Sequence, residues 1–159
     1  MRNVKRKIIY LISLVICFYM LVFAYNNIGV NMSCMYGESN YPTIKDGSID
    51  VSIVTNIIKN NCLYEMMDPE SGTEIVKRVV AVPGDTVEFK DEKLYINGVE
   101  DSSPFSKNAD YSNKNGLRVV VPENEYFVLG DNRNVSIDSR YFGTVPEECI
   151  ISKVLFTIY

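Results

Sequence analysis

The stretch IVKRVVAVPGDTVEFKDEKLYING, residues 75–98, indicates β-structure. It opens with an apolar block, residues 75–82, which ends at a Pro-Gly-Asp turn. Val87 and Phe89 then alternate with charged residues, and a second apolar run ends at the pair Asn97-Gly98. Short apolar or alternating segments between turn residues are typical of strands, and an Asn-Gly pair is typical of a hairpin. We therefore expect consecutive antiparallel strands here.

The rest of the chain after residue 25 follows the same pattern. Ile49, Val51 and Ile53 alternate with polar residues, and no stretch keeps a helical period of apolar residues. Further blocks rich in β-branched and aromatic residues cover residues 117–121, 126–129 and 150–158. The polar segment 99–116 is expected to form a long surface loop, and residues 55–74 contain no clean strand signal. The sequence predicts an all-β outer domain.

The amino terminus predicts a membrane anchor. Residues 8–25 are 18 consecutive uncharged residues, close to the roughly 20 that span a bilayer as a helix. Arg2, Lys5, Arg6 and Lys7 precede this run, whereas the next charged residue after it is Glu38. Because basic residues flank the cytoplasmic side of membrane helices, we expect the amino terminus in the cytoplasm and the β domain outside.

This interpretation divides the chain into a cytoplasmic basic tail (1–7), a transmembrane anchor (8–25) and an extracytoplasmic β domain (26–159). The expected location is the cell membrane, crossed once. An alternative is a cleavable signal peptide, because Val22-Phe23-Ala24 could serve as a cleavage site after a shorter apolar core. The alternative stays open at this stage.

Composition excludes several classes of protein. The chain has 159 residues, 47% of them hydrophobic and 23% charged, which fits one membrane segment and one folded domain. It has no histidine, which excludes a Ser-His-Asp triad, a Cys-His dyad and every histidine-ligated metal site. A hydrolytic enzyme with this sequence needs another base.

Charge and cysteine content exclude further partners. Four of the 16 basic residues and none of the 20 acidic ones lie in residues 1–25, so the remaining part carries 12 basic and 20 acidic residues, a net charge of −8. Nucleic acid is a poor partner for that surface. Cys17, Cys34, Cys62 and Cys149 form no C-x-x-C pair. At most one disulfide could join the last three, and a cysteine-only zinc site is disfavoured.

Two segments contain candidate catalytic side chains. Ser39 lies in a Gly- and Pro-containing turn, residues 37–43, where an ordinary turn serine is the simpler interpretation. Lys77 and Arg78 interrupt an apolar strand, and strand alternation sends their side chains to opposite faces. Burial lowers the pKa of a lysine and provides a neutral amine as a base without histidine. The alternative is that both cations extend to solvent at a sheet edge.

A third segment, GDNRNVSIDSRYFG, covers residues 130–143 and is dense in hydrogen-bonding side chains. Composition alone would allow a surface turn with ion pairs. Taken together and in this order, however, the three segments resemble the motifs of the type I signal peptidases, membrane-anchored Ser/Lys proteases, in their Gram-positive form. That family has Ser-Met-x-Pro-Thr at the serine segment, and Ser39, Pro42 and Thr43 match it.

The other two motifs match more fully. The family's Lys-Arg-Val-x-x-x-Pro-Gly-Asp corresponds to residues 77–85. Its Gly-Asp-Asn-Arg-x-x-Ser-x-Asp-Ser-Arg-x-x-Gly matches residues 130–143 at every fixed position. The resemblance covers the whole chain, including the amino-terminal anchor, and implies the signal-peptidase β fold for the outer domain.

The resemblance also implies residue roles. Ser39 would be the nucleophile, Lys77 the general base, and Ser136 would hold the lysine amine in place. Asp138 and Arg140 would form a supporting ion pair, for which the alternative is a solvated bridge worth under about 1 kcal/mol. No metal and no organic cofactor is required for this chemistry.

The sequence departs from the family at several positions near the nucleophile. Asn40 stands where the family usually has Met, and Gly37 lacks the hydroxyl that some members use to stabilise the oxyanion. The backbone N–H of Ser39 must then contribute more. Gly47-Ser48 replaces the family's usual Gly-Asp. These changes affect the expected substrate fit more than the catalytic pair.

The function implied is removal of signal peptides from exported preproteins by cleavage after small residues, with preprotein signal peptides and membrane lipid as partners. One alternative is a pilus-associated member, which would process pilin precursors or act as a non-hydrolytic assembly factor. Retention of both Ser39 and Lys77 opposes the non-hydrolytic role. Soluble repressor autoproteases also use a Ser/Lys pair, but the predicted membrane span opposes that interpretation.

Overall fold

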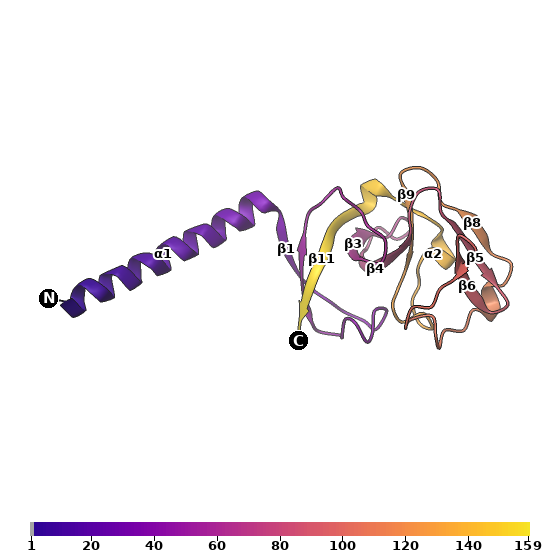
Figure 1. Cartoon of the computed structure of the whole chain (residues 1–159), viewed down its shortest axis with the longest axis horizontal. Helices are drawn as coiled ribbons and strands as arrows, with labels where there is room; N and C mark the ends of the chain where they lie inside the picture. The colour runs from indigo at the N-terminus through magenta and orange to yellow at the C-terminus, as the bar shows by residue number, and fades with distance from the viewer. Residues whose placement is uncertain (1) are drawn as a thin grey trace.

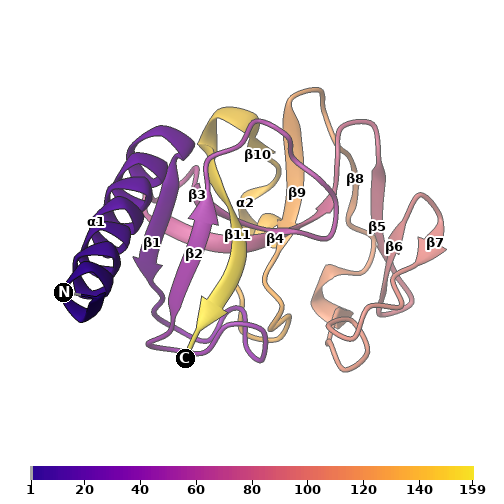
Figure 2. The same cartoon turned by 60° about the vertical axis from the view of Figure 1, so that its left-hand side comes forward.

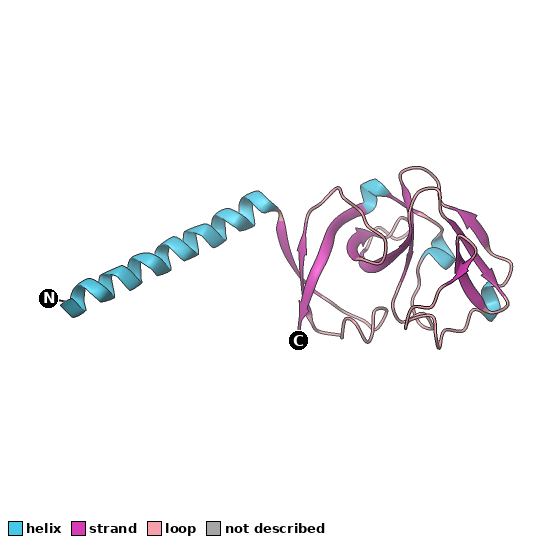
Figure 3. Ribbon diagram, in the orientation of Figure 1, coloured by secondary structure: helices cyan, strands magenta, loops and turns pink. Residues whose placement is uncertain are grey.

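A computed structural model describes residues 2–159 of the chain, with side chains for residues 5–23 and 29–159. Met1 of the predicted basic tail, and the side chains of Arg2, Ala24 and Tyr25, lie outside the described part. Helix α1, Arg2–Ile28, extends away from a body made of strands and loops (Figures 1 and 3). It is longer at both ends than the predicted span of residues 8–25.

The side chains of α1 are exposed throughout the described range, and the segment Lys5–Phe23 is long and apolar enough to cross a membrane. A helix with apolar side chains all around it and no protein packed on it is suited to a lipid environment. The helix is therefore compatible with the predicted anchor.

The body consists of two antiparallel sheets. The larger has seven strands in the order β1-β2-β11-β3-β4-β9-β10, and the smaller has four in the order β7-β6-β5-β8. The strands of the larger sheet are β1 Val30–Cys34, β2 Ile49–Ile53, β3 Leu63–Met67, β4 Glu74–Ala81, β9 Glu125–Leu129, β10 Val145–Pro146 and β11 Ile150–Ile158. Those of the smaller are β5 Thr86–Lys90, β6 Lys93–Ile96, β7 Val99–Glu100 and β8 Arg118–Val120. Three short helices complete the body: η1 Ser112–Lys114, α2 Ser139–Phe142 and η2 Glu147–Cys149.

The larger sheet is strongly curled because β11 pairs with two strands along its length. Its first half pairs with β3 from Ile150 onward, and its second half pairs with β2 up to Ile158. Register shifts interrupt both ladders, and such bulges increase the twist and bend of a strand. Figure 2 shows β1, β2 and β11 side by side at the end of the body from which α1 extends, with the smaller sheet at the far end.

The main hydrophobic core joins the two sheets. It contains Phe89 from the smaller sheet and Phe127 from the larger, both fully buried. Tyr111, from the segment predicted as a surface loop, also enters this core and packs edge to face on Phe89 with a ring-centroid distance of 5.1 Å. The loop prediction for residues 99–116 is correct for most of its length, but β7 occupies Val99–Glu100. Tyr111 is a core residue because its ring fills space between the sheets.

Strands β1 and β3 were not predicted from the sequence. The prediction that residues 55–74 lack a clean strand is wrong, because β3 occupies residues 63–67. Its central residue, Glu65, is 1% exposed and accepts hydrogen bonds from the hydroxyls of Ser33, Ser52 and Ser152. The Glu65 carboxylate can be buried because hydroxyls from three other strands bond to it. In the sequence, however, this residue counts as polar, so the alternation of apolar and polar residues that marks a strand is interrupted. The predicted all-β outer domain with one amino-terminal helix is nevertheless confirmed.

Candidate active site

Ser39 lies in the loop that connects β1 to β2, and it is half-buried. Its carbonyl oxygen accepts a hydrogen bond from the Asn132 N–H at 3.0 Å, and the Asn132 side-chain amide donates to the Glu38 carbonyl at 3.1 Å. The serine loop is thus fastened to the segment that follows β9. This contact joins the first and the third predicted motifs, which are more than ninety residues apart in sequence.

Lys77 lies within β4, between β3 and β9, and only 4% of it is exposed. Within residues 2–159 its amine has no hydrogen bond and no ion pair. Burial lowers the pKa of Lys77 below the ordinary lysine value, and the charge of Arg140 lowers it further, whereas the carboxylates of Asp138 and Asp68 act in the opposite direction. Burial therefore makes the charged form of Lys77 less favourable than that of a solvent-exposed lysine.

Ser39 and Lys77 line the same open groove, which has a volume of about 740 Å³. Ile75, Val135 and Ile137 add apolar walls, and Asp68 lies at the edge. A smaller pocket of about 170 Å³ adjoins Ser39. It is lined by Cys34, Met35, Tyr36, Gly37, Ser39, Asn40, Ile44, Glu74, Ile75 and Val76. The two residues predicted as nucleophile and base are thus brought to one surface.

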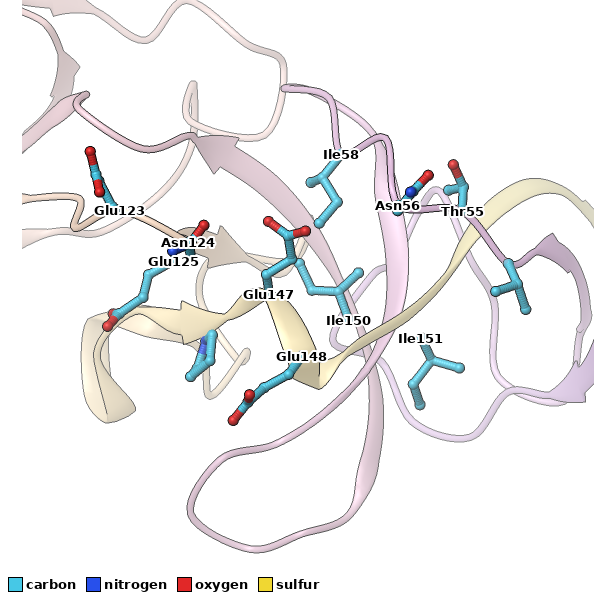
Figure 4. Close-up of a pocket in the computed structure, with 12 residues that line it drawn as sticks. Thr55, Asn56, Ile58, Glu123, Asn124, Glu125, Glu147, Glu148, Ile150 and Ile151 are labelled. Atoms are coloured by element: carbon cyan, nitrogen blue, oxygen red, sulfur yellow. The ribbon is translucent and has the colours of Figure 1, made fainter.

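Another hollow, of about 680 Å³, lies between the segment after β2 and the start of β11 (Figure 4). Glu123, Glu125, Glu147 and Glu148 surround it, and isoleucine side chains point into it. None of the five predicted site residues, all of which the structure describes, lines this hollow. Its size therefore does not make it the candidate site.

Gly130 separates the serine loop from Ser136. A Cβ atom at residue 130 would lie 2.3 Å from the Ser136 Oγ and 2.4 Å from the Ser39 carbonyl oxygen. Only glycine allows this approach, so the motif's first glycine brings Ser136 close to the serine loop. Ser136 is 2% exposed, and its hydroxyl makes one long hydrogen bond of 3.5 Å, to the Ile137 carbonyl.

Asp138 and Arg140 form a two-pronged ion pair, with Nε–Oδ1 at 2.8 Å and Nη2–Oδ2 at 2.9 Å. Their side chains are 0% and 3% exposed, so this is not a solvated surface bridge. Asp138 also accepts from the Gly130 N–H at 3.0 Å, and Arg140 donates to the Ser136 carbonyl at 3.1 Å. The pair fixes the loop on both sides of Ser136.

Sequence comparison identifies the family. The family model described as "Signal peptidase, peptidase S26" matches residues 4–159. The chain belongs to this family. It is 35% identical to signal peptidase IB of Staphylococcus aureus (strain COL), over 98% of this chain and 91% of that protein. It is 37% identical to signal peptidase I T of Bacillus subtilis (strain 168), over 77% of this chain and 70% of that protein.

A solved structure agrees. The signal peptidase I of Enterococcus faecalis V583 superposes with a TM-score of 0.51 at 36% identity, covering 62% of this chain and 97% of that chain. The resemblance to Gram-positive type I signal peptidases is thus confirmed, and membership assigns a peptidase that removes signal peptides. These comparisons contain nothing that favours a pilus-associated role.

Sequence reasoning missed several contacts of this signal peptidase site. Arg78 does not extend to solvent: its guanidinium donates to both carboxylate oxygens of Asp131, at 2.6 and 2.7 Å. The Thr43 hydroxyl donates to the same carboxylate at 2.5 Å. Strand alternation did indicate that Lys77 and Arg78 face opposite ways, and they line different hollows. The partner of Arg78, however, comes from a loop 53 residues away.

Proposed function

We propose that Ser39 and Lys77 are the catalytic dyad with which this peptidase cleaves signal peptides. The observation that carries the proposal is the groove that both residues line, in which the lysine amine is buried and unpaired within the described residues. A charged lysine is disfavoured there, so its neutral form is available as a base. No histidine exists to share this role.

The reaction is acyl transfer. Neutral Lys77 takes the proton of the Ser39 hydroxyl while Ser39 Oγ attacks the scissile carbonyl carbon. The protonated Lys77 amine then gives this proton to the nitrogen of the leaving peptide as the C–N bond breaks, and Lys77 is neutral again. The resulting ester is hydrolysed by a water molecule whose proton passes to the same lysine amine. Ser39 is then regenerated, and the mature protein and the signal peptide are the two products.

The backbone N–H of Ser39 is the donor that we assign to the oxyanion. Gly37 has no side chain, and its own N–H donates to Asp46 Oδ1 at 2.7 Å, so it is already engaged. Among the hydrogen bonds within residues 2–159, none uses the Ser39 N–H as donor. A free, fixed N–H next to the attacking oxygen is the geometry that stabilises a tetrahedral intermediate.

We assign positioning roles to the residues around Ser136. The Ser136 hydroxyl, with only its long bond to Ile137, remains able to accept a hydrogen bond from the lysine amine. The buried Asp138–Arg140 pair holds the backbone on both sides of Ser136. These three residues thus aim the base rather than react.

Small side chains before the cut fit the hollow next to Ser39. The pocket of about 170 Å³ is walled by Met35, Ile44 and Val76, and it is smaller than the roughly 300 Å³ at which ligand pockets usually begin. This supports cleavage after small residues.

The membrane arrangement is part of the proposal. We place the domain outside the cell membrane, with α1 crossing the lipid once and the basic tail in the cytoplasm. Ten residues, 29–38, separate the helix end from Ser39, at most about 36 Å of extended chain. The groove must then stay near the bilayer, where the apolar core of a preprotein signal peptide also lies.

The test is cleavage of a preprotein by the full chain in membrane vesicles. Ser39→Ala should abolish cleavage while the thermal unfolding midpoint stays within a few degrees of wild type, because the hydroxyl lies in an open groove. A folded Ser39→Ala protein that cleaves at the normal rate would refute the dyad.

A further inference from the structure

The side chain of Asn40 joins three segments of the proposed site. It is 5% exposed, donates from Nδ2 to the Val76 carbonyl at 2.7 Å, and accepts at Oδ1 from the Asp131 N–H at 3.3 Å. Asn40 directly follows Ser39, and Val76 directly precedes Lys77. One amide therefore connects the chain at the nucleophile to the chain at the base.

The strand register explains why an amide fits there. Strands β4 and β9 pair in antiparallel fashion, with Arg78 opposite Leu129. Continuing that register would place Val76 opposite Asp131, but β9 ends at Leu129. The Asn40 amide lies between the Val76 carbonyl and the Asp131 N–H and bonds to both, so it replaces the direct ladder hydrogen bond that these two groups would otherwise form.

Both partners of Asn40 are held from elsewhere. Val76 is paired with Glu65 of β3, and the Asp131 carboxylate is fixed by Arg78 and Thr43. The serine loop therefore enters a gap of fixed width between β4 and the segment after β9. The Asn132 N–H to Ser39 carbonyl bond, 3.0 Å long, sits beside the same gap.

We infer that Asn40 is a positioning residue that sets the placement of Ser39 relative to Lys77 by occupying the gap between Val76 and Asp131. The inference rests on the proposed Ser/Lys mechanism. In this chain, removal of the Asn40 amide would leave a buried carbonyl and a buried N–H without partners, or would let them bond directly and push the serine loop out. Either change displaces Ser39 from the lysine amine.

The test compares kcat, KM and pH profile for the full chain in vesicles, with a preprotein as substrate. Asn40→Leu is nearly isosteric and removes both hydrogen bonds. Asn40→Asp keeps an acceptor for the Asp131 N–H and replaces the donor to the Val76 carbonyl with a second carboxylate oxygen. Asn97→Ala is the matched control, because the Asn97 amide also donates once and accepts once, at 2.7 and 2.8 Å, but in the smaller sheet.

We expect Asn40→Leu to lower kcat about 10- to 100-fold, with KM within about threefold of wild type, since the groove walls remain. The apparent pKa in its pH profile should equal that of wild type, because Lys77 stays buried. Only the kcat at the high-pH plateau should fall. Asn40→Asp should also lower the plateau kcat, by about threefold or more, because a carboxylate oxygen then faces the Val76 carbonyl while the bond to the Asp131 N–H remains. Asn97→Ala should lower the unfolding midpoint without changing kcat.

A kcat within twofold of wild type in the folded Asn40→Leu protein would overturn the inference; if that variant does not fold, the same result for Asn40→Asp decides against it. The inference would also be overturned if Asn97→Ala lost as much kcat as Asn40→Leu, because the effect of Asn40 would then be one of general stability. Ser39→Ala is run alongside. Retained cleavage by Ser39→Ala would overturn the proposed dyad and, with it, the inference about Asn40. If Ser39→Ala is inactive, an unchanged kcat in the Asn40 variants counts against the role of Asn40 alone and not against the dyad.

Discussion

In the proposed mechanism, the burial of Lys77 costs folding stability and lowers the pKa of the amine that acts as the base. Its amine is 4% exposed and unpaired within the described residues, and this environment disfavours the charged form in which lysine is normally found. The neighbouring carboxylates Asp138 and Asp68 favour the charged form but act against a larger effect of burial. The net effect is a pKa of Lys77 below the ordinary lysine value.

The pH dependence of cleavage follows from that balance. Because the pKa of Lys77 lies below its ordinary value, activity should rise with pH and level off below the pH at which free lysine, with a pKa of about 10.4, loses its proton. Lys77→Arg should be inactive at every pH, since guanidinium does not release its proton. Rates of preprotein cleavage over a pH series check both statements; substantial activity in Lys77→Arg would show that another group takes the proton.

Ser136 should matter less than Lys77. Ser136→Ala removes a hydroxyl that can accept from the lysine amine, but the amine itself stays buried and its pKa stays lowered by that burial. We expect kcat to fall by about tenfold or more without vanishing, because a less well aimed base still works. Single-turnover cleavage rates measure the effect. Ser103→Ala, in the loop beyond β7, serves as the control; an unchanged Ser136→Ala rate would remove Ser136 from the site.

At the scale of the elements, the sequence predicted strands best where burial follows the two-residue period. Strands β2 and β11 have the predicted bounds because their apolar residues alternate or run without interruption. Strands β1 and β3 were missed since each places a polar side chain inward: Ser33 in β1 and Glu65 in β3 bond to each other at 2.8 Å. Such a buried pair satisfies its polar groups across strands, which no local pattern can reveal.

The same limit applies to the candidate site. The three motifs identified Ser39, Lys77 and the 130–143 segment, because their residue types are fixed by the chemistry. The contacts that hold them together were not predictable. Asn40 bonds to Val76 and Asp131, which lie 36 and 91 positions further along the chain. That Asn40 differs from the Met usual in the family gave no indication that its amide would fill a gap between two paired strands.

The polar interior of the curled sheet makes a prediction about stability. Asp50 of β2 is fully buried; its Oδ1 accepts from the Thr157 hydroxyl at 2.7 Å, while Oδ2 has no hydrogen-bond partner in the described part of the chain. Burial raises the pKa of Asp50 above the ordinary aspartate value. The Thr157 hydrogen bond opposes this effect, and the nearby Glu65 carboxylate adds to it.

A raised pKa means that the folded state favours protonated Asp50. Its contribution to stability is complete below the ordinary aspartate pKa of 3.8 and is lost as pH rises through the higher pKa of the folded state. Asp50→Asn is neutral at every pH, so it should raise the free energy of unfolding at pH 7 by about 1–3 kcal/mol. The gain should shrink toward pH 4.

Thermal or urea unfolding between pH 4 and 8 measures the effect. Asp91→Asn, at an exposed turn between β5 and β6, is the matched control and should change little across the same range. A loss of stability in Asp50→Asn at pH 7 would mean that the ionised carboxylate is preferred inside the sheet.

At the scale of the whole molecule, the exposed helix and the charge distribution act together. The side chains of α1 from Lys5 to Phe23 are exposed and mostly apolar, and residues 26–159 carry a net charge of −8 by sequence. A membrane would surround the apolar side chains of α1 with lipid. It would also bring enzyme and substrate together, because a signal peptide inserted in the same bilayer meets the groove at a much higher effective concentration than in solution.

The orientation can be tested with intact cells that produce the full chain. If the amino terminus is cytoplasmic, added protease should degrade the β domain and leave a protected fragment that contains α1. Replacing Lys5, Arg6 and Lys7 with glutamate removes the basic flank, so a larger share of the domain should become protected from protease. The control variant Lys5→Arg, Arg6→Lys and Lys7→Arg keeps the charge at all three residues and should behave as wild type. Recovery of a mature chain that begins near Tyr25 would instead establish a cleaved signal peptide, since the anchor would then be absent from the working enzyme.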